Sequence, residues 1–160
     1  MIITAKQTEV ILNGNYKFSQ LGFSMMVTRL KVNYAKDPTP AALQKAVEEI
    51  NLFFEKFLIE FKELPLNGFI GELQRVLKEL GIGILRVEKA DPDKGEFTLT
   101  VSEDLDCSGL PDLGIEVCNY DEGFIAGIFF KYTGVTFHAK EVDCWCSGDR
   151  TCRFAVNRLH

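Results

Sequence analysis

Four of the five cysteines in this 160-residue chain lie between positions 118 and 152. They are Cys118, Cys144, Cys146 and Cys152, and the one cysteine outside that stretch is Cys107. In a reducing compartment, clustered cysteines indicate metal or redox chemistry rather than structural disulfides, and the odd count agrees with this. The stretch must therefore fold so that its thiols serve a common chemical purpose.

The residues around these cysteines predict a helix and a β-hairpin. Apolar residues recur at three- and four-residue spacing over 121–132, which is typical of a helix. Residues 135–142 alternate as a strand, and a turn then leads into a partner strand at 153–156. Such a hairpin would bring Cys144 and Cys152 close together.

Thiolates from a hairpin turn and from a helix start are a common way to build a tetrahedral zinc site. Glu141 lies three residues before Cys144 and can reach the same point from the end of its strand. Zinc accepts mixed sulfur and carboxylate ligands. Because four protein ligands leave no position for an activated water, we expect a structural zinc and assign no catalytic residue.

Three segments carry a recognisable pattern. They are Cys118 with the following Tyr120-Asp-Glu-Gly-Phe-Ile-Ala-Gly-Ile, then Glu141-Val-Asp-Cys144, then Gly148-Asp-Arg-Thr-Cys-Arg-Phe154. This pattern resembles the 4-vinyl reductase domain family, which includes the sensor domains of aromatic-responsive bacterial activators. The resemblance implies a zinc site of three cysteines and one glutamate, and these map onto Cys118, Glu141, Cys144 and Cys152.

Cys146 is left over in this assignment. An all-cysteine site with Cys146 in place of Glu141 is the main alternative, and the spacing fits both. A Cys146 that is not a ligand is either a thiol poised for redox sensing or an ordinary unreactive cysteine. Lys140, Arg150 and Arg153 are candidates to balance the negative charge of the filled site.

The composition is that of a folded domain, with 46% hydrophobic and 26% charged residues. We treat 1–160 as a single domain, with a helical part at 1–81 and a strand and zinc-site part at 82–160. The net charge of -5 argues against binding a polyanion such as nucleic acid. No leader and no apolar run near the roughly 18 residues that span a bilayer is present, so we expect a cytoplasmic protein without a membrane partner.

The N-terminal half predicts helices. Residues 1–12 read as a strand or extended arm, and 16–34 carry a helical apolar stripe. The clearest helix begins at Pro40. Its apolar stripe consists of Leu43, Val47, Ile50, Phe54, Phe57 and Phe61. Further apolar residues widen this stripe, and we expect a second layer or the partner of a homodimer to cover them.

A third helix is predicted over 69–80, and strands at 82–90 and 96–103 flank a turn as a hairpin. The order of elements predicts an α+β fold, an antiparallel sheet of about four to five strands with helices packed on it and the zinc site at the C-terminal hairpin. The resemblance implies the same architecture, shared with the ligand-binding domains of haem nitric-oxide sensors and with vesicle-tethering subunits.

Aromatic and methionine residues could line an apolar cavity between the helices and the sheet, or simply form the core. They are Phe18, Phe23, Met25, Met26, Phe53, Phe54, Phe57, Phe69, Phe97, Phe124 and Phe129. In the related sensor domains this region holds the small aromatic effector, which implies a small apolar or aromatic ligand here. His138 we interpret as a structural or exposed residue rather than a ligand of metal.

The first functional hypothesis is a zinc-containing small-molecule-binding or sensor module that forms a homodimer. The second is a reductase-type enzyme acting on tetrapyrrole or aromatic substrates. It is disfavoured because the sequence has no GxGxxG, GxxxxGK[ST], HExxH or GxSxG motif. The third is a redox or scaffold module, in which the thiols or the dimer surface are the functional feature.

Overall fold

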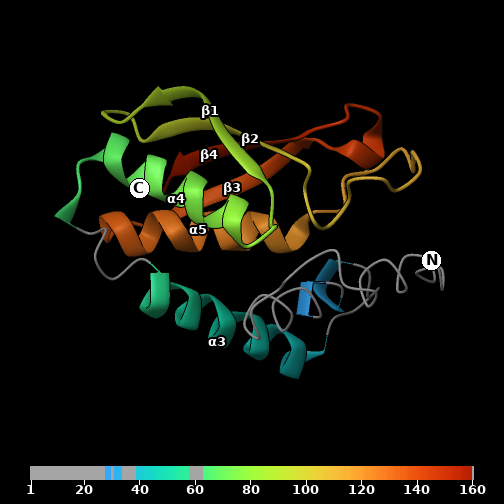
Figure 1. The fold of residues 1–160 in the computed structure, drawn as a ribbon, viewed down its shortest axis with the longest axis horizontal. Coiled ribbons are helices and arrows are strands. Elements are labelled where there is room, and N and C mark those ends of the chain that lie inside the picture. The colour runs from blue at the N-terminus through green and yellow to red at the C-terminus, as the bar shows by residue number, and fades with distance from the viewer. Residues whose placement is uncertain (1–27, 30, 34–38, 58–62, 160) are drawn as a thin grey trace.

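The computed structural model describes residues 28–29, 31–33, 39–57 and 63–159 (Figure 1). The arm predicted at 1–12, most of the helix predicted at 16–34 and the end of the helix that begins at Pro40 lie outside these residues. Residues 28–29 and 31–33 are helical, as predicted.

The described part of the chain is built on a four-stranded antiparallel sheet with the order β1-β2-β4-β3. The strands are β1 (Ile84–Asp91), β2 (Glu96–Ser102), β3 (Phe137–Asp143) and β4 (Cys152–Arg158). Both predicted hairpins are present, β1 with β2 and β3 with β4. They are joined where β2 pairs with β4, which sets Val101 opposite Cys152. The α+β prediction is confirmed, with four strands in this sheet.

Helices cover the sheet in two further layers (Figure 1). The helix α4 (Leu66–Glu79) packs on β1, and α5 (Asn119–Thr133) packs on β3. The helix α3 (Pro40–Phe57) lies outside them, against α5. In α4 the first turn begins earlier than predicted because Pro65, with φ of -62°, already sets the backbone for helix entry.

The strands alternate between the core and the solvent. Along β3, Phe137, Ala139 and Glu141 are buried, whereas His138 and Lys140 are exposed. This is the two-residue period of a half-buried strand. It confirms the interpretation of His138 as an exposed residue, and it places Glu141 on the same side of the sheet as the core.

Aromatic rings fill the space between α5 and the sheet. The ring centroid of Phe129 lies 4.8 Å from that of Phe97 on β2 and 5.1 Å from that of Phe137 on β3. The helix then ends at Gly134, whose φ of 76° is left-handed and whose N–H donates to the carbonyl of Phe130. Together these contacts fix the angle at which α5 crosses β3.

The helix α3 presents small residues, rather than its large apolar stripe, to the rest of the chain. Ala46 is buried, whereas Leu43 is 47% and Val47 is 58% exposed. Small residues let two helices approach closely, and a Cβ on Gly127 of α5 would meet Ile50 at 3.6 Å. Within one chain, the predicted stripe is therefore not the packed face at Leu43 and Val47.

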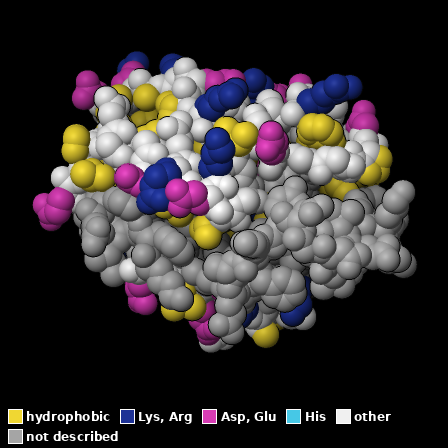
Figure 2. All heavy atoms as spheres, viewed as in Figure 1, with side chains coloured by type: hydrophobic (Ala, Val, Ile, Leu, Met, Phe, Trp, Pro, Cys, Tyr) yellow, Lys and Arg dark blue, Asp and Glu magenta, His cyan; other side chains and the backbone are white. Residues whose placement is uncertain are grey.

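On the face shown in Figure 2, the described Lys and Arg side chains lie interspersed with Asp and Glu. Two of the surface pairs are Arg153 with Glu88, at 2.8 Å, and Lys140 with Glu122, at 2.7 Å. Within the described ranges, no helix combines the length and the apolar character needed to cross a membrane.

Candidate metal centre

Four buried cysteines meet where the two hairpins and α5 converge. Cys107, Cys118, Cys144 and Cys152 have their Sγ atoms all within 4.8 Å of one another. The Sγ of Cys118 lies 3.6 Å from that of Cys152 and 3.9 Å from that of Cys144. The Sγ of Cys107 lies 3.1 Å from that of Cys152. Each of these side chains is at most 1% exposed.

The spacing of these sulfurs fits a single four-coordinate ion. Zinc–sulfur bonds of about 2.3 Å in a tetrahedron place the sulfurs about 3.8 Å apart. The two distances from Cys118 match this value, and the shorter distance from Cys107 is still well beyond the roughly 2.05 Å of a disulfide. The four cysteines are therefore a donor set that suits zinc.

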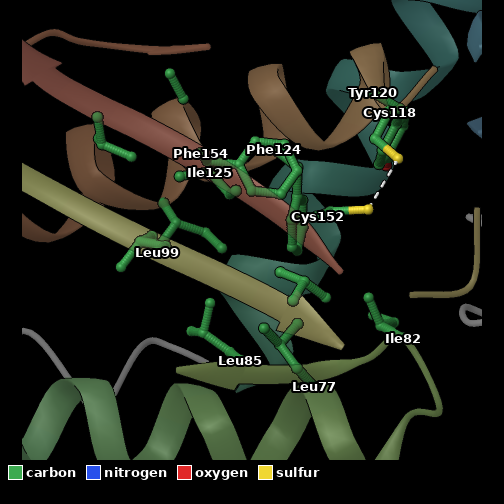
Figure 3. Packing of buried hydrophobic residues seen from close by; sticks show 14 of the residues in the cluster. Leu77, Ile82, Leu85, Leu99, Cys118, Tyr120, Phe124, Ile125, Cys152 and Phe154 are labelled. Carbon is green, nitrogen blue, oxygen red and sulfur yellow. Dashed lines mark hydrogen bonds between the residues drawn. The ribbon is translucent and has the colours of Figure 1, made fainter. Parts of the chain in front are cut away.

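Each cysteine is held by a different element. Cys118 caps the start of α5, Cys144 follows the end of β3, and Cys152 is the first residue of β4. Cys107 comes from the loop after β2. Figure 3 shows the sulfurs of Cys118 and Cys152 facing one another at the edge of the apolar core. The structure thus brings together three of the four residues predicted as zinc ligands, and adds Cys107.

The turn after β3 is built around Cys144. The backbone N–H of Cys144 donates to Oγ of Ser147 at 2.9 Å, and the N–H of Ser147 donates back to the Cys144 side chain. The N–H of Asp149 donates to the carbonyl of Cys144 at 3.1 Å. Gly148 takes a φ of 102°, which a side chain would oppose. These bonds fix the Cys144 sulfur before any ion is bound.

The loop that carries Cys107 is fastened at both ends. The N–H of Leu105 donates to the carbonyl of Ile82 at 2.9 Å. On the other side, Nε1 of Trp145 donates to the carbonyl of Leu110 at 2.9 Å. The sequence places Cys107 in a Gly- and Pro-containing loop with no ligand spacing to identify it. The signal lies instead in the pairing of β2 with β4, which sequence alone does not supply.

Cys146 lies outside the group of four sulfurs. It is buried, and burial raises the pKa of its thiol to about 12. Its carbonyl accepts hydrogen bonds from the N–H groups of Leu113 and Gly114, at 2.7 and 3.0 Å. The residue therefore ties the Cys107 loop to the turn through its backbone, while its thiol is kept in the neutral, unreactive form.

Glu141 borders the sulfurs without belonging to the group of four. Its side chain is buried, and Oε2 accepts a hydrogen bond of 2.9 Å from the backbone N–H of Cys118. Oε1 has no hydrogen-bond partner among the described residues. Burial raises the pKa of this carboxyl to about 8. The assignment of Glu141 as a ligand stays a prediction.

The thiols perturb one another strongly. Hydrogen bonds from the thiols of Cys107 and Cys118 lower the pKa of Cys144, and the same interactions raise the pKa of Cys118. One thiolate is thus stabilised by its protonated neighbours. Four thiolates buried together require a cation, which would displace the remaining protons. Lys140 and Arg153 do not serve as that cation, because both pair with surface carboxylates.

A small apolar cavity lies beside the centre, where α4, α5 and the sheet meet. It encloses about 20 Å³, room for about one water molecule. Asp121 is its one ionisable lining residue, and Phe124 and Phe129 are the predicted aromatic residues that line it. The lining consists of Leu73, Leu77, Ile82, Leu85, Leu99, Val101, Asp121, Phe124, Ile125, Ile128 and Phe129.

The fold and the site together define a small α+β domain with a buried thiol centre. Residues 97–158 match the family model of the 4-vinyl reductase domain. This match confirms, over those residues, the resemblance found in the sequence. It begins at β2 and runs to the end of β4, so it contains all four cysteines of the centre.

Two uncharacterized proteins of Methanocaldococcus jannaschii are similar in sequence. MJ1642 is 31% identical over 95 residues, which are 59% of this chain and 56% of that protein. MJ0150 is 33% identical over 90 residues, which are 56% of this chain and 51% of that protein. The matched region thus spans little more than half the length of each relative.

Three solved structures are similar in shape. A vinyl-4-reductase family protein from Methanocaldococcus jannaschii has a TM-score of 0.49 and 17% identity, and the match covers 92% of this chain and 99% of that one. The phenol-responsive sensory domain of the transcription activator PoxR, solved with phenol, has a TM-score of 0.49 and 13% identity, covering 99% and 76%. A trafficking protein particle complex subunit 3 from Naegleria fowleri, covalently bound to palmitic acid, has a TM-score of 0.52 and 12% identity, covering 96% and 88%. The last of these indicates a shared fold.

Proposed function

We propose that this protein is a small-molecule-binding module whose C-terminal half is held together by a structural zinc ion. The observation that carries the proposal is the group of four buried sulfurs with tetrahedral spacing. Cys118, Cys144 and Cys152 are ligands in every set that we consider. The fourth is Cys107, which the distances favour, or Glu141, which the sequence pattern favours.

The proposed zinc has a structural role because its four ligands join four separate parts of the chain. A closed shell of protein ligands leaves no position for a reacting water. The ion would fasten the β3–β4 turn and the loop after β2 to the first residue of α5. Structural zinc sites contribute directly to folding free energy, so the C-terminal half should depend on metal for its stability.

The proposed ligand site is the cavity between α4, α5 and the sheet. Its lining is apolar except for Asp121, whose Oδ2 has no hydrogen-bond partner within the described ranges. A ligand with an apolar body and one hydrogen-bond donor matches that lining. Because the cavity holds only about 20 Å³, binding would require α4 to shift away from α5. Such a shift is the conformational change by which a sensor module would report its ligand.

Self-association through α3 is the second part of the proposal. Leu43, Val47 and Leu52 are 47%, 58% and 41% exposed on this helix. A symmetric dimer is the commonest arrangement that covers a repeated apolar surface of this kind. We therefore propose that a second copy of the chain packs on this face.

The zinc proposal is tested by measuring metal in protein purified without added zinc. We expect about one zinc per chain, and we expect chelation to lower the midpoint of thermal unfolding. The ligand proposal is tested separately, by titrating the zinc-loaded protein with phenol and with toluene, which has the same shape but no donor. Phenol should raise the unfolding midpoint more than toluene does, and equal effects would contradict a role for Asp121.

A further inference from the structure

A buried arginine links the N-terminal helical segment, residues 28–33, to the metal centre. Nε of Arg29 donates to Oδ1 of Asp106 at 2.7 Å, and its second terminal nitrogen pairs with Oδ1 of Asp121. Its guanidinium carbon lies 4.8 Å from the centroid of the Tyr120 ring. The Arg29 side chain is 1% exposed. Among the described residues, it is the one buried basic side chain.

Asn33 repeats these contacts one turn later on the same segment. Its Nδ2 donates to Oδ2 of Asp106 at 2.7 Å, and its Oδ1 accepts from the backbone N–H of Tyr120 at 2.6 Å. Both residues therefore touch the same two parts of the chain. One is the loop at Asp106, and the other is the first turn of α5.

Those two parts of the chain are the ones that carry two of the cysteines. Asp106 directly precedes Cys107, and Asp121 follows Cys118 by one helical turn. A carboxylate oxygen of Asp121 lies within 4.8 Å of the Cys118 sulfur. A metal ion would hold the loop and the helix start at a fixed separation. The two carboxylates are thereby spaced for one guanidinium to bridge.

From this geometry we propose that Arg29 acts as a latch, which docks residues 28–33 onto the domain when the thiol centre is filled and releases them when it is empty. This inference rests on the metal site proposed above. Removing the ion frees the Cys107 loop from the Cys118 turn, so Asp106 and Asp121 separate and the bridge is lost. Coupling between two sites is reciprocal, so Arg29 in turn strengthens metal binding.

Charge supports the same coupling. Four thiolates around a divalent ion leave a net negative charge, and Asp104, Asp106 and Asp121 add to it. Arg29 supplies the buried positive charge at this point. Partners that support metal ligands from outside typically change metal affinity by about 10- to 100-fold when they are removed.

The first test is hydrogen exchange of the full wild-type chain, with zinc and after chelation. We expect the amides of residues 28–33 to exchange at least about tenfold faster without zinc, while those of α4, which packs on β1 away from the cysteines, keep their protection. Equal protection of residues 28–33 in both states would overturn the latch. So would loss of protection in α4 to the same extent, because that result describes global unfolding.

The second test compares Arg29→Gln with Lys31→Gln. The two substitutions remove the same charge from the same segment, but Lys31 is exposed. Competition with a chelator should show zinc affinity about tenfold lower in Arg29→Gln and unchanged in Lys31→Gln, and Arg29→Lys should recover part of the loss. The substitution should also lower the unfolding midpoint more with zinc than without it, which a purely structural arginine would not do.

The outcomes separate the two proposals. Wild-type protein that holds no zinc overturns the metal site and the latch together. Wild-type protein that holds zinc, with an Arg29→Gln variant of unchanged zinc affinity, overturns the latch and leaves the metal site standing.

Discussion

The Sγ atoms of Cys107 and Cys152 lie 3.1 Å apart, although 45 residues separate them in the sequence. Cys152 is the first residue of β4, and Cys107 follows the end of β2. Because β2 and β4 are adjacent in the sheet, the ends of the two strands deliver both sulfurs to one place. Cys107 thereby joins a centre that the cysteine spacing alone confines to residues 118–152.

Single substitutions identify the fourth ligand. We expect Cys107→Ser to lower zinc affinity by at least about 100-fold, because it removes a sulfur that lies within 4.8 Å of the other three. Glu141→Gln should lower affinity by no more than the roughly 10- to 100-fold that is typical of a supporting residue. Chelator competition on both variants checks this.

Cys146→Ser is the matched control for these variants, since Cys146 is equally buried but lies outside the group of four. It should keep the wild-type zinc affinity. Zinc that survives Cys107→Ser and is lost in Glu141→Gln would establish the set of three cysteines and Glu141. Zinc lost in Cys146→Ser would establish the all-cysteine alternative with Cys146.

The metal-free protein should become less stable as the pH rises. Burial raises the pKa of Glu141 from 4.5 to about 8. A carboxyl that binds its proton more tightly in the folded state stabilises that state at low pH, and this contribution is lost between about pH 4.5 and 8. Urea unfolding of the chelated protein across this range should show the decline.

Glu141→Gln should flatten the Glu141 part of that decline, because glutamine stays neutral at every pH. Glu55→Gln, at an exposed position of α3, should leave the profile as in the wild type. A metal-free protein whose stability rises between pH 5 and 8, and in which Glu141→Gln changes nothing, would contradict this account of the buried carboxyl.

Enlarging the cavity should create a site for a small apolar molecule. Leu77 lines the cavity and is buried, so Leu77→Ala should lower the free energy of unfolding by about 2–5 kcal/mol. Benzene should then restore part of the lost stability, since it binds the folded state only. Thermal unfolding with and without benzene measures both effects.

Val156→Ala provides the comparison for the cavity variant. Val156 belongs to the same core but does not line the cavity. This variant should lose stability without responding to benzene. A benzene response of equal size in both variants would show that the space between α4 and α5 has no special capacity for a ligand.

Self-association should depend on the exposed face of α3. Val47→Glu places a charge on that face, and we expect it to convert a dimer into a monomer at micromolar concentration in light-scattering measurements. Ile115→Glu makes the same change at a loop residue that is 55% exposed, and it should leave the mass unchanged. A wild-type protein that is already monomeric would refute the dimer.

The strands and helices of the C-terminal half could be predicted because each carries a local signal. The alternation of Phe137, Ala139 and Glu141 defines β3, and Gly134 ends α5 with a left-handed backbone that glycine adopts easily. The packing of α3 could not be predicted in the same way. Its large apolar residues indicate one face, while close approach to α5 selects the small residue Ala46.

The metal centre was predictable in part for the same reason. Cys144 and Cys152 flank one hairpin, so local pairing brings them together, and the family resemblance adds Cys118. Cys107 and Arg29 come from segments whose positions depend on long-range packing, and no spacing in the sequence relates them to the others. Their roles required the three-dimensional structure.

X-ray absorption spectroscopy at the zinc edge tests the central claim most directly, because it reports the number and kind of atoms bound to the ion. For protein purified without added zinc, we predict a shell of four sulfurs at about 2.3 Å. A shell containing nitrogen or oxygen would contradict the four-cysteine assignment, and purified protein without any bound metal would contradict the proposed centre itself.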